Sequence, residues 1–168
     1  MRKVVVAAFV LCVIMSGCAK SSASFTCTYD PCAGQAPPAE ITQLETYLSG
    51  AGVTTATKHC SGMYYQVKNA GAGADVTTCS YVTVNYKGVL TNGTVFDQTT
   101  TTPYSNTLAR LIEGWKKGIP LIKKGGSITL YVPPTLGYGP VDQKDANGNI
   151  LIPGNSILIF DVQLVDVQ

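Results

Sequence analysis

The sequence is poor in charge, in histidine and in long apolar runs. Only 13% of its 168 residues are charged while 45% are apolar, so the chain is not a charge-driven disordered polypeptide. Lysine and arginine never occur more than two in a row, which argues against a nucleic-acid-binding protein. Threonine, tyrosine and valine are plentiful, with 17 glycines and 9 prolines, and this composition is typical of a β-rich domain with many turns.

The longest apolar run lies near the N-terminus and is too short to cross a bilayer as a helix. It covers residues 4–15 after the basic pair Arg2 and Lys3, whereas a spanning helix needs about 20 residues. The run therefore predicts a signal peptide over residues 1–17. The residues before Cys18 resemble a bacterial lipobox, so we expect an exported chain, lipid-anchored through Cys18 to the bacterial cell envelope at the outer membrane or periplasmic face. The alternative is a secretory signal with a nearby cleavage site and no lipid.

Four of the six cysteines lie beyond residue 18. An even number in an exported chain predicts two disulfides, and four cysteines allow three pairings. We favour Cys27 with Cys32, which close a turn-prone ring, and Cys60 with Cys79, which flank two expected strands. The separations of five and nineteen residues differ from the CxxC spacing of metal sites, and the only histidine is His59. The sequence therefore predicts neither a metal nor a cofactor.

Hydrophobic periodicity predicts one helix followed by a series of strands. Pro38 opens the helix, Leu44 and Leu48 share its apolar face, and Gly50 or Gly52 ends it. This helix either packs on the following domain, which we favour, or binds a partner. Apolar and polar residues then alternate in segments that predict strands, at 63–68, 82–86, 95–97, 128–132 and 157–165.

Turn and loop signals separate these strands. The dipeptide Asn92-Gly93 predicts a hairpin turn with positive φ at both central residues. A short helix is expected over residues 111–117, and the Gly- and Pro-rich segment 133–154 is expected to be irregular. Antiparallel strands with one short helix make an α+β domain of about 110 residues.

Four stretches, taken in order, resemble an FKBP-type peptidyl-prolyl isomerase domain. They are VTVNYKGVLTNGTVFD at 82–97, LIEGW at 111–115, LGYG at 136–139 and IPGNSILIFDVQL at 152–164. The resemblance covers about residues 61–168 and implies an α+β fold in which a twisted antiparallel β-sheet wraps around one short helix. The chain then divides into a signal peptide (1–17), a lipid tether with an N-terminal helical appendage (18–59) and an isomerase domain (60–168).

The same resemblance implies a pocket between sheet and helix that binds a proline-containing segment. The implied catalytic residues are Tyr86, Phe96, Asp97, Ile112, Trp115, Tyr138 and Phe160. Further residues are implied to line the substrate pocket or its mouth, namely Tyr104, Leu111, Leu136, Gly137 and Ile152.

The implied roles divide the pocket into apolar surfaces and hydrogen-bond donors. Trp115 is expected at the floor, and Phe96 and Phe160 at the walls. The backbone N–H of Ile112 and the hydroxyl of Tyr138 are each expected to bind a substrate carbonyl. No nucleophile is required for this chemistry.

One edge of the pocket departs from the family pattern. Asp97 is expected at this edge, held by Tyr86. Near Pro103, where the family commonly has an aromatic pocket residue, either Tyr104 or Asn106 stands here, and Asn106 occupies the position of a usual phenylalanine. The wall is therefore expected to be more polar and the pocket weaker.

Without the family pattern these residues have plainer interpretations. Taken alone, Trp115 and Phe160 are more typical of a hydrophobic core than of a binding site. Positions without support from the resemblance are expected at the surface, namely Tyr81, Tyr131 and the lysine pairs at 116–117 and 123–124.

The implied function is cis–trans isomerisation of Xaa-Pro bonds in exported proteins. Amide resonance sets a rotation barrier of about 18–20 kcal/mol, and the twisted transition state has lost this resonance and is less polar. A dry aromatic pocket therefore favours the twisted amide over the planar one. The alternative is an FKBP-fold chaperone or proline-peptide binding module with weak or no catalysis, and a purely structural envelope lipoprotein is the least supported. The expected partners are proline-containing polypeptides, macrolide inhibitors of the family, and the membrane through the lipid, but no nucleic acid.

Overall fold

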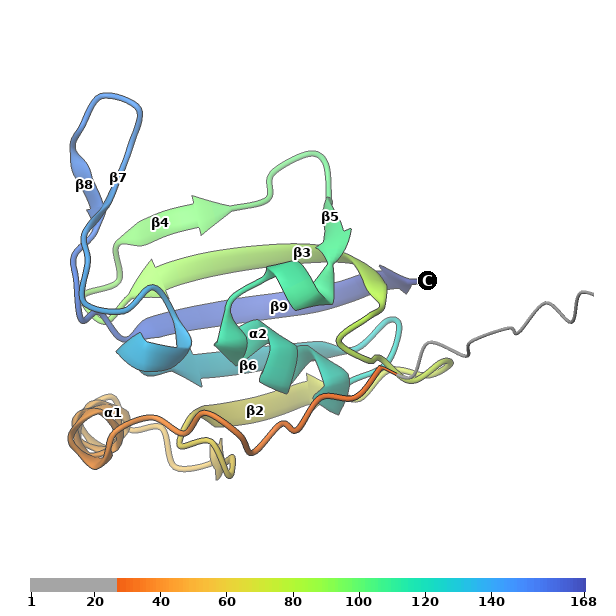
Figure 1. Cartoon of the computed structure of the whole chain (residues 1–168), viewed down its shortest axis with the longest axis horizontal. Helices are drawn as coiled ribbons and strands as arrows, with labels where there is room; N and C mark the ends of the chain where they lie inside the picture. The colour runs from red at the N-terminus through yellow and green to blue at the C-terminus, as the bar shows by residue number, and fades with distance from the viewer. Residues whose placement is uncertain (1–26) are drawn as a thin grey trace, which may run out of the picture.

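A computed structural model describes residues 27–168 (Figure 1). The expected signal peptide and the expected lipid site at Cys18 lie outside the described residues. Within 27–168 no helix is both long and apolar enough to cross a membrane.

A single antiparallel sheet forms the body of the molecule. Six of its seven strands pair in the order β1-β2-β6-β9-β3-β4, and the remaining strand, β5, pairs with β3. Their bounds are β1 Thr57–Lys58, β2 Tyr64–Asn69, β3 Tyr81–Leu90, β4 Val95–Gln98, β5 Tyr104–Thr107, β6 Ser127–Val132 and β9 Leu158–Val167. The α+β architecture expected from the sequence is confirmed by this sheet and by the short helix that it curves around (Figure 1).

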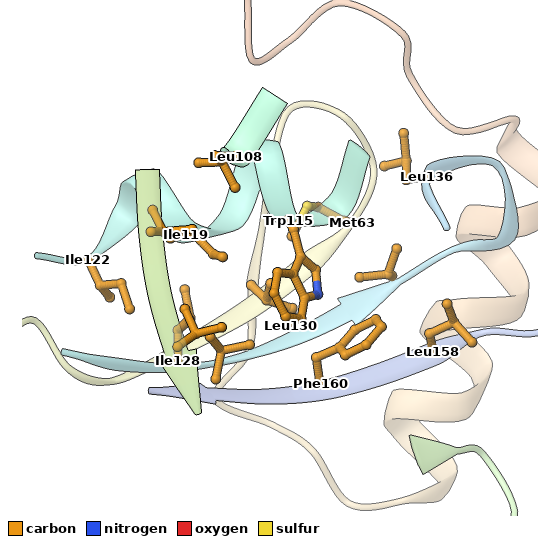
Figure 2. Packing of buried hydrophobic residues seen from close by; sticks show 14 of the residues in the cluster. Met63, Leu108, Trp115, Ile119, Ile122, Ile128, Leu130, Leu136, Leu158 and Phe160 are labelled. Atoms are coloured by element: carbon orange, nitrogen blue, oxygen red, sulfur yellow. The ribbon is translucent and has the colours of Figure 1, made fainter. Parts of the chain in front are cut away.

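Strand β9 shows how alternation fixes which face of the sheet carries the core. Leu158, Phe160 and Leu164 are buried, and the intervening Asp161 and Gln163 are exposed. Successive side chains of a strand point to opposite faces, so the apolar set lies on one face. Figure 2 shows Leu158 and Phe160 facing the apolar side chains of the helical segments across the core.

Helix α2 (Glu113–Gly118) lies against this apolar face and is flanked by the 3-10 turns η1 (Leu108–Arg110) and η2 (Ile119–Leu121). Two glycines allow its close approach to β6. A Cβ on Gly114 would lie 2.6 Å from Val132 Cγ1, and a Cβ on Gly118 would lie 2.4 Å from Leu130 Cδ2. The two glycines lie one helical turn apart on the same face of α2. Their close approach to β6 therefore sets how deeply Trp115, the residue after Gly114, enters the core.

Helix α1 (Pro38–Gly50) packs on the opposite face of the sheet, at one end (Figure 1). Its Leu44 and Leu48 are buried in a separate cluster with Tyr131 of β6 and Ile159 of β9. Packing on the domain, the favoured expectation for this helix, is confirmed. The surface position expected for Tyr131 is wrong, because that side chain, only 7% exposed, lies under α1. Tyr81, 46% exposed, is on the surface as expected.

The favoured disulfide pairing is wrong. Cys27 pairs with Cys79 and Cys32 pairs with Cys60. The segment before α1 does not close a local ring but runs along the folded domain, where the N–H of Ala36 donates to the Ser61 carbonyl at 2.9 Å. Each of the two cysteines in this segment therefore meets a distant part of the domain, and sequence separation gave no sign of either contact.

Lys117 also contradicts its expected exposure to solvent. Its side chain is buried, and its Nζ donates to the carbonyl oxygens of Pro31 at 3.1 Å and Ala33 at 2.7 Å. The ammonium group thereby joins α2 to the disulfide-bonded segment. Lys123 and Lys124 are exposed, as expected.

The connections differ from expectation in three places. The β3–β4 turn has Gly93 at a φ of 85°, but Asn92 does not take positive φ; the turn closes with Gly93 N–H on the Leu90 carbonyl at 2.9 Å. It is therefore a three-residue turn of the type that ends in a glycine bulge. Strand β5 was not expected. The segment expected to be irregular contains η3 (Pro134–Leu136) and a small separate hairpin of β7 (Gln143–Lys144) and β8 (Ile150–Ile152).

Candidate active site

A partly open cavity of about 260 Å³ lies between α2 and the adjoining strands. Side chains from strands, from the α2 region and from the loop after η3 meet in it. The nine lining residues are Tyr86, Asp97, Tyr104, Arg110, Leu111, Ile112, Trp115, Tyr138 and Phe160. Aromatic rings dominate the set, and Asp97 and Arg110 are its only charged members.

Trp115 forms the floor through edge-to-face contacts with two other rings. Its ring centroid lies 5.0 Å from that of Tyr86 and 5.4 Å from that of Phe160. The indole N–H is buried and has no hydrogen-bond partner among the described residues, and Figure 2 shows this nitrogen on the side of Phe160. The floor is therefore made of packed aromatic rings, and Trp115, only 4% exposed, is largely shielded from water.

Phe96 does not line the cavity but packs behind Phe160, which does. Its ring packs edge-to-face on Phe160 at 5.5 Å. Gly88 makes the arrangement fit, because a Cβ there would lie 2.5 Å from Phe96 Cζ and 3.0 Å from Phe160 Cε1. The two rings meet over the one position of β3 that has no side chain.

One edge of the cavity is polar. The hydroxyl of Tyr86 on β3 donates to Asp97 Oδ2 on β4 at 2.5 Å. Burial first, and this hydrogen bond second, raise the pKa of Tyr86 well above its ordinary value. The phenol therefore stays protonated at neutral pH and remains the donor to Asp97.

Two cavity-lining residues carry hydrogen-bond donors that have no acceptor among the described residues. The hydroxyl of Tyr138 makes no hydrogen bond to a described residue, and burial, with the charge of Asp97, raises its pKa, so the proton is retained. The backbone N–H of Ile112 likewise has no acceptor within 27–168, although the Ile112 carbonyl accepts from Trp115 N–H at 3.0 Å. Both donors are available to carbonyl groups of a bound polypeptide.

Tyr104, rather than Asn106, provides the aromatic side chain of the remaining wall. The Asn106 amide donates to the Tyr104 hydroxyl at 2.8 Å, and the Tyr104 ring packs on Tyr86 at 6.1 Å. The departure from the family pattern thus leaves an aromatic wall in place and adds an amide behind it.

Three of the expected mouth residues are not among those that line the cavity. Leu136 and Ile152 are buried in the core, and Gly137 packs against Leu158, whose Cδ1 would lie 2.8 Å from an added Cβ. His59 lines a different part of the surface, beside the disulfide-bonded segment. No group of three His, Cys, Asp or Glu side chains suited to a metal ion occurs within 27–168.

Arg110 lines the cavity and was not singled out from the sequence. It is the last residue of η1, directly before Leu111. The signal that could have found it is this position, next to the segment that the resemblance placed in the pocket.

Comparison with known proteins identifies relatives of this domain. The sequence model of the family described as FKBP-type peptidyl-prolyl cis-trans isomerase matches residues 73–165. FkpA of Buchnera aphidicola is 45% identical over 112 residues, 66% of this chain and 44% of the relative. FkpA of Escherichia coli is 41% identical over 126 residues, 74% of this chain and 43% of the relative. The chain thus spans less than half the length of these curated relatives.

Solved structures agree with these matches. The crystal structure of Escherichia coli FkpA aligns with a TM-score of 0.66 at 40% identity, over 77% of this chain and 59% of that chain. A peptidyl-prolyl cis-trans isomerase from Pseudomonas syringae aligns with a TM-score of 0.65 at 26% identity, over 80% of this chain and 98% of that chain.

Proposed function

Because the chain belongs to the FKBP-type peptidyl-prolyl cis-trans isomerase family, we propose that it catalyses rotation about Xaa-Pro bonds of proline-containing polypeptides. The observation that carries the proposal is the aromatic cavity floored by Trp115, with two unoccupied donors at Ile112 and Tyr138 on its surface. An apolar surface that excludes water, placed beside donors for the flanking backbone, suits a twisted amide.

The prolyl ring enters the cavity and lies over Trp115 with Phe160 at its side. Rotation removes the amide resonance that sets a barrier of about 18–20 kcal/mol, and the twisted amide is less polar than the planar one. The dry aromatic surroundings therefore stabilise the transition state more than the ground state. Phe96 contributes by holding Phe160 in place.

The flanking chain is held while the bond turns. The Ile112 N–H donates to one substrate carbonyl and the Tyr138 hydroxyl donates to another, which fixes the substrate on both sides of the rotating bond. Asp97, oriented by Tyr86, forms the polar edge of the cavity. Leu111 and Tyr104 line the sides. The buried Leu136 and Ile152 and the half-buried Gly137 support the mouth.

A second candidate function is polypeptide binding with little catalysis. It is favoured by exposed apolar side chains on the β7–β8 hairpin, namely Val141 (68% exposed), Ile150 (55%) and Leu151 (42%). Such side chains suit contact with an unfolded chain beyond its proline. Variants of this hairpin separate the two functions. If the protein only binds polypeptides, the hairpin variants protect an unfolded client protein from aggregation less well than the original protein does. In that case neither the variants nor the original protein accelerates peptide isomerisation.

The proposed site of action is supported by the disulfides and by the N-terminal sequence. Two disulfides within 27–168 support folding in an oxidising compartment outside the cytoplasm. Residues 1–17 act as the signal peptide, Cys18 carries the lipid that holds the chain at the bacterial envelope, 18–59 form the tether and appendage, and 60–168 form the isomerase domain. Replacing Cys18 with serine tests the anchor: the chain should move from the membrane fraction to the soluble fraction of cells.

The experiment for the activity is a peptide assay. Addition of the folded chain should accelerate isomerisation of a Xaa-Pro peptide, and a macrolide inhibitor of the family should compete at the Trp115 pocket. Absence of acceleration from folded protein refutes the enzyme assignment.

A further inference from the structure

Arg110 places a positive charge on the wall of the pocket without a matching acid. Its side chain is exposed and lines the cavity with Leu111 and Ile112. It forms no salt bridge with any carboxylate of residues 27–168, although five lysines of that range do. Its guanidinium is therefore available to a ligand.

The acid of the cavity lining, Asp97, and the acid nearest to Arg110 in the sequence on the following helix, Glu113, are both engaged elsewhere. Glu113, three residues along the chain, accepts from Lys116 Nζ at 2.7 Å and from the Tyr29 hydroxyl at 2.8 Å. Asp97, across the cavity on β4, accepts from the Tyr86 hydroxyl. The pocket thus has an acid at one edge, held by a phenol, and an unpaired base at another.

The position of Arg110 in the chain relates its charge to the substrate. It lies two residues before Ile112, which lines the cavity and whose N–H has no acceptor among residues 27–168. If a substrate carbonyl binds to that N–H, the neighbouring substrate residues lie beside the connection between η1 and α2. A long arginine side chain at position 110 can reach them there. Asp97 lies on β4, a different element, so one part of the cavity carries a negative charge and another carries the positive charge of Arg110.

We propose that Arg110 is a specificity-determining residue, which binds an acidic side chain of the polypeptide next to its proline, on the side held by Ile112. The inference rests on the proposed function only in that the cavity binds proline-containing polypeptides. Arginine suits this role because its planar guanidinium binds a carboxylate through two parallel hydrogen bonds.

The expected size of the effect follows from the exposure of the site. Ion pairs in contact with water contribute little, so a glutamate at the preferred position should tighten binding about two- to fivefold relative to glutamine. Screening by salt should reduce this preference, since both charges are exposed to solvent.

The test uses Trp115, the only tryptophan of the chain, as a reporter at the pocket floor. Its fluorescence is titrated with short peptides that contain one central proline, in pairs that differ by Glu or Gln at a single position before or after the proline. The full chain is compared with Arg110→Gln and Arg110→Glu. The control is Lys87→Gln, because Lys87 is exposed and follows the pocket residue Tyr86 on β3, so it points to the opposite face of the sheet.

The expected result is a glutamate preference on one side of the proline only, lost in Arg110→Gln, reversed in Arg110→Glu and unchanged in Lys87→Gln. The proposal is overturned if the preference is absent, if it survives Arg110→Gln, or if neither peptide of any pair changes the fluorescence. Isomerisation is measured on the same peptides. Binding with the predicted preference but without acceleration sustains the role of Arg110 and refutes the catalytic assignment alone.

Discussion

The ammonium group of Lys117 on α2 lies 2.7 Å from the carbonyl oxygen of Ala33, in a segment 84 residues earlier in the chain. This segment is fixed at Cys27 and Cys32 by disulfides to the domain. The helix that carries Trp115 is thus connected, through one buried charge, to the segment before α1. The segment before α1 therefore helps to hold in place the helix that forms the floor of the pocket.

Replacing Lys117 with methionine should destabilise the fold. Methionine fills the space of the lysine stem but leaves the carbonyls of Pro31 and Ala33 without their charged donor, at a cost of about 2–4 kcal/mol. Urea unfolding measures the change. Lys124→Met is the matched control and should change stability little, because Lys124 pairs with Asp166 on the exposed surface. Equal stability of the two variants would show that the buried contact contributes nothing.

Gly118→Ala should destabilise the protein by about 1–3 kcal/mol, because its Cβ would lie 2.4 Å from Leu130 Cδ2 and Leu130 is fully buried. Gly50→Ala, at the end of α1, is the control. Nothing lies within 4 Å of its added Cβ, so this variant should be as stable as the original or slightly more stable. Thermal unfolding of both variants gives the comparison, and similar melting temperatures would contradict the packing of α2 on β6.

Tyr138→Phe should lower kcat/KM for a Xaa-Pro peptide about three- to tenfold, the effect of one lost hydrogen bond to the substrate. The side chain is 41% exposed, so the fold should tolerate the change. Tyr81→Phe removes a similarly exposed hydroxyl away from the pocket and should leave the rate unchanged. A normal rate in Tyr138→Phe would remove this hydroxyl from the mechanism.

The stability of the fold should depend on pH through the protonation of His59. Burial, and then the charge of Lys117, lower the pKa of His59 in the folded protein. The unfolded chain therefore binds the proton more readily, and the stabilisation present above the unfolded pKa of about 6.5 is lost as the pH falls toward the folded value. Unfolding free energies measured between neutral and mildly acidic pH should decrease in the original protein and decrease less in His59→Gln. Parallel curves would contradict this account.

Much of the fold could be predicted because its signals are local. The alternation from Leu158 to Leu164 identified β9 and its buried face, and the proline and leucine spacing identified α1. The family motifs led to Trp115, Tyr138 and their partners, which the structure brings together in one cavity. Nothing in the spacing of these residues alone distinguished a pocket from a core.

The errors in the disulfide pairing, in Lys117 and in Tyr131 all concern contacts between distant segments. The disulfide partners of Cys27 and Cys32 depend on a segment that runs along the domain, and the burial of Lys117 depends on two carbonyl groups of that same segment. Tyr131 lies on the sheet face that α1 covers. The strand pattern does not show that a helix packs there, so the sequence predicted a surface position. Such tertiary contacts override local preference wherever an appendage packs on a domain.

The most direct test of the central claim is exchange NMR spectroscopy on a peptide with a single Xaa-Pro bond. Uncatalysed cis–trans exchange takes tens to hundreds of seconds, too slow for exchange cross-peaks. With a small amount of the folded chain, cross-peaks between the cis and trans forms should appear, and they should weaken in Tyr138→Phe but not in Tyr81→Phe. Absence of cross-peaks, while Trp115 fluorescence reports bound peptide, would contradict catalysis and favour a binding module.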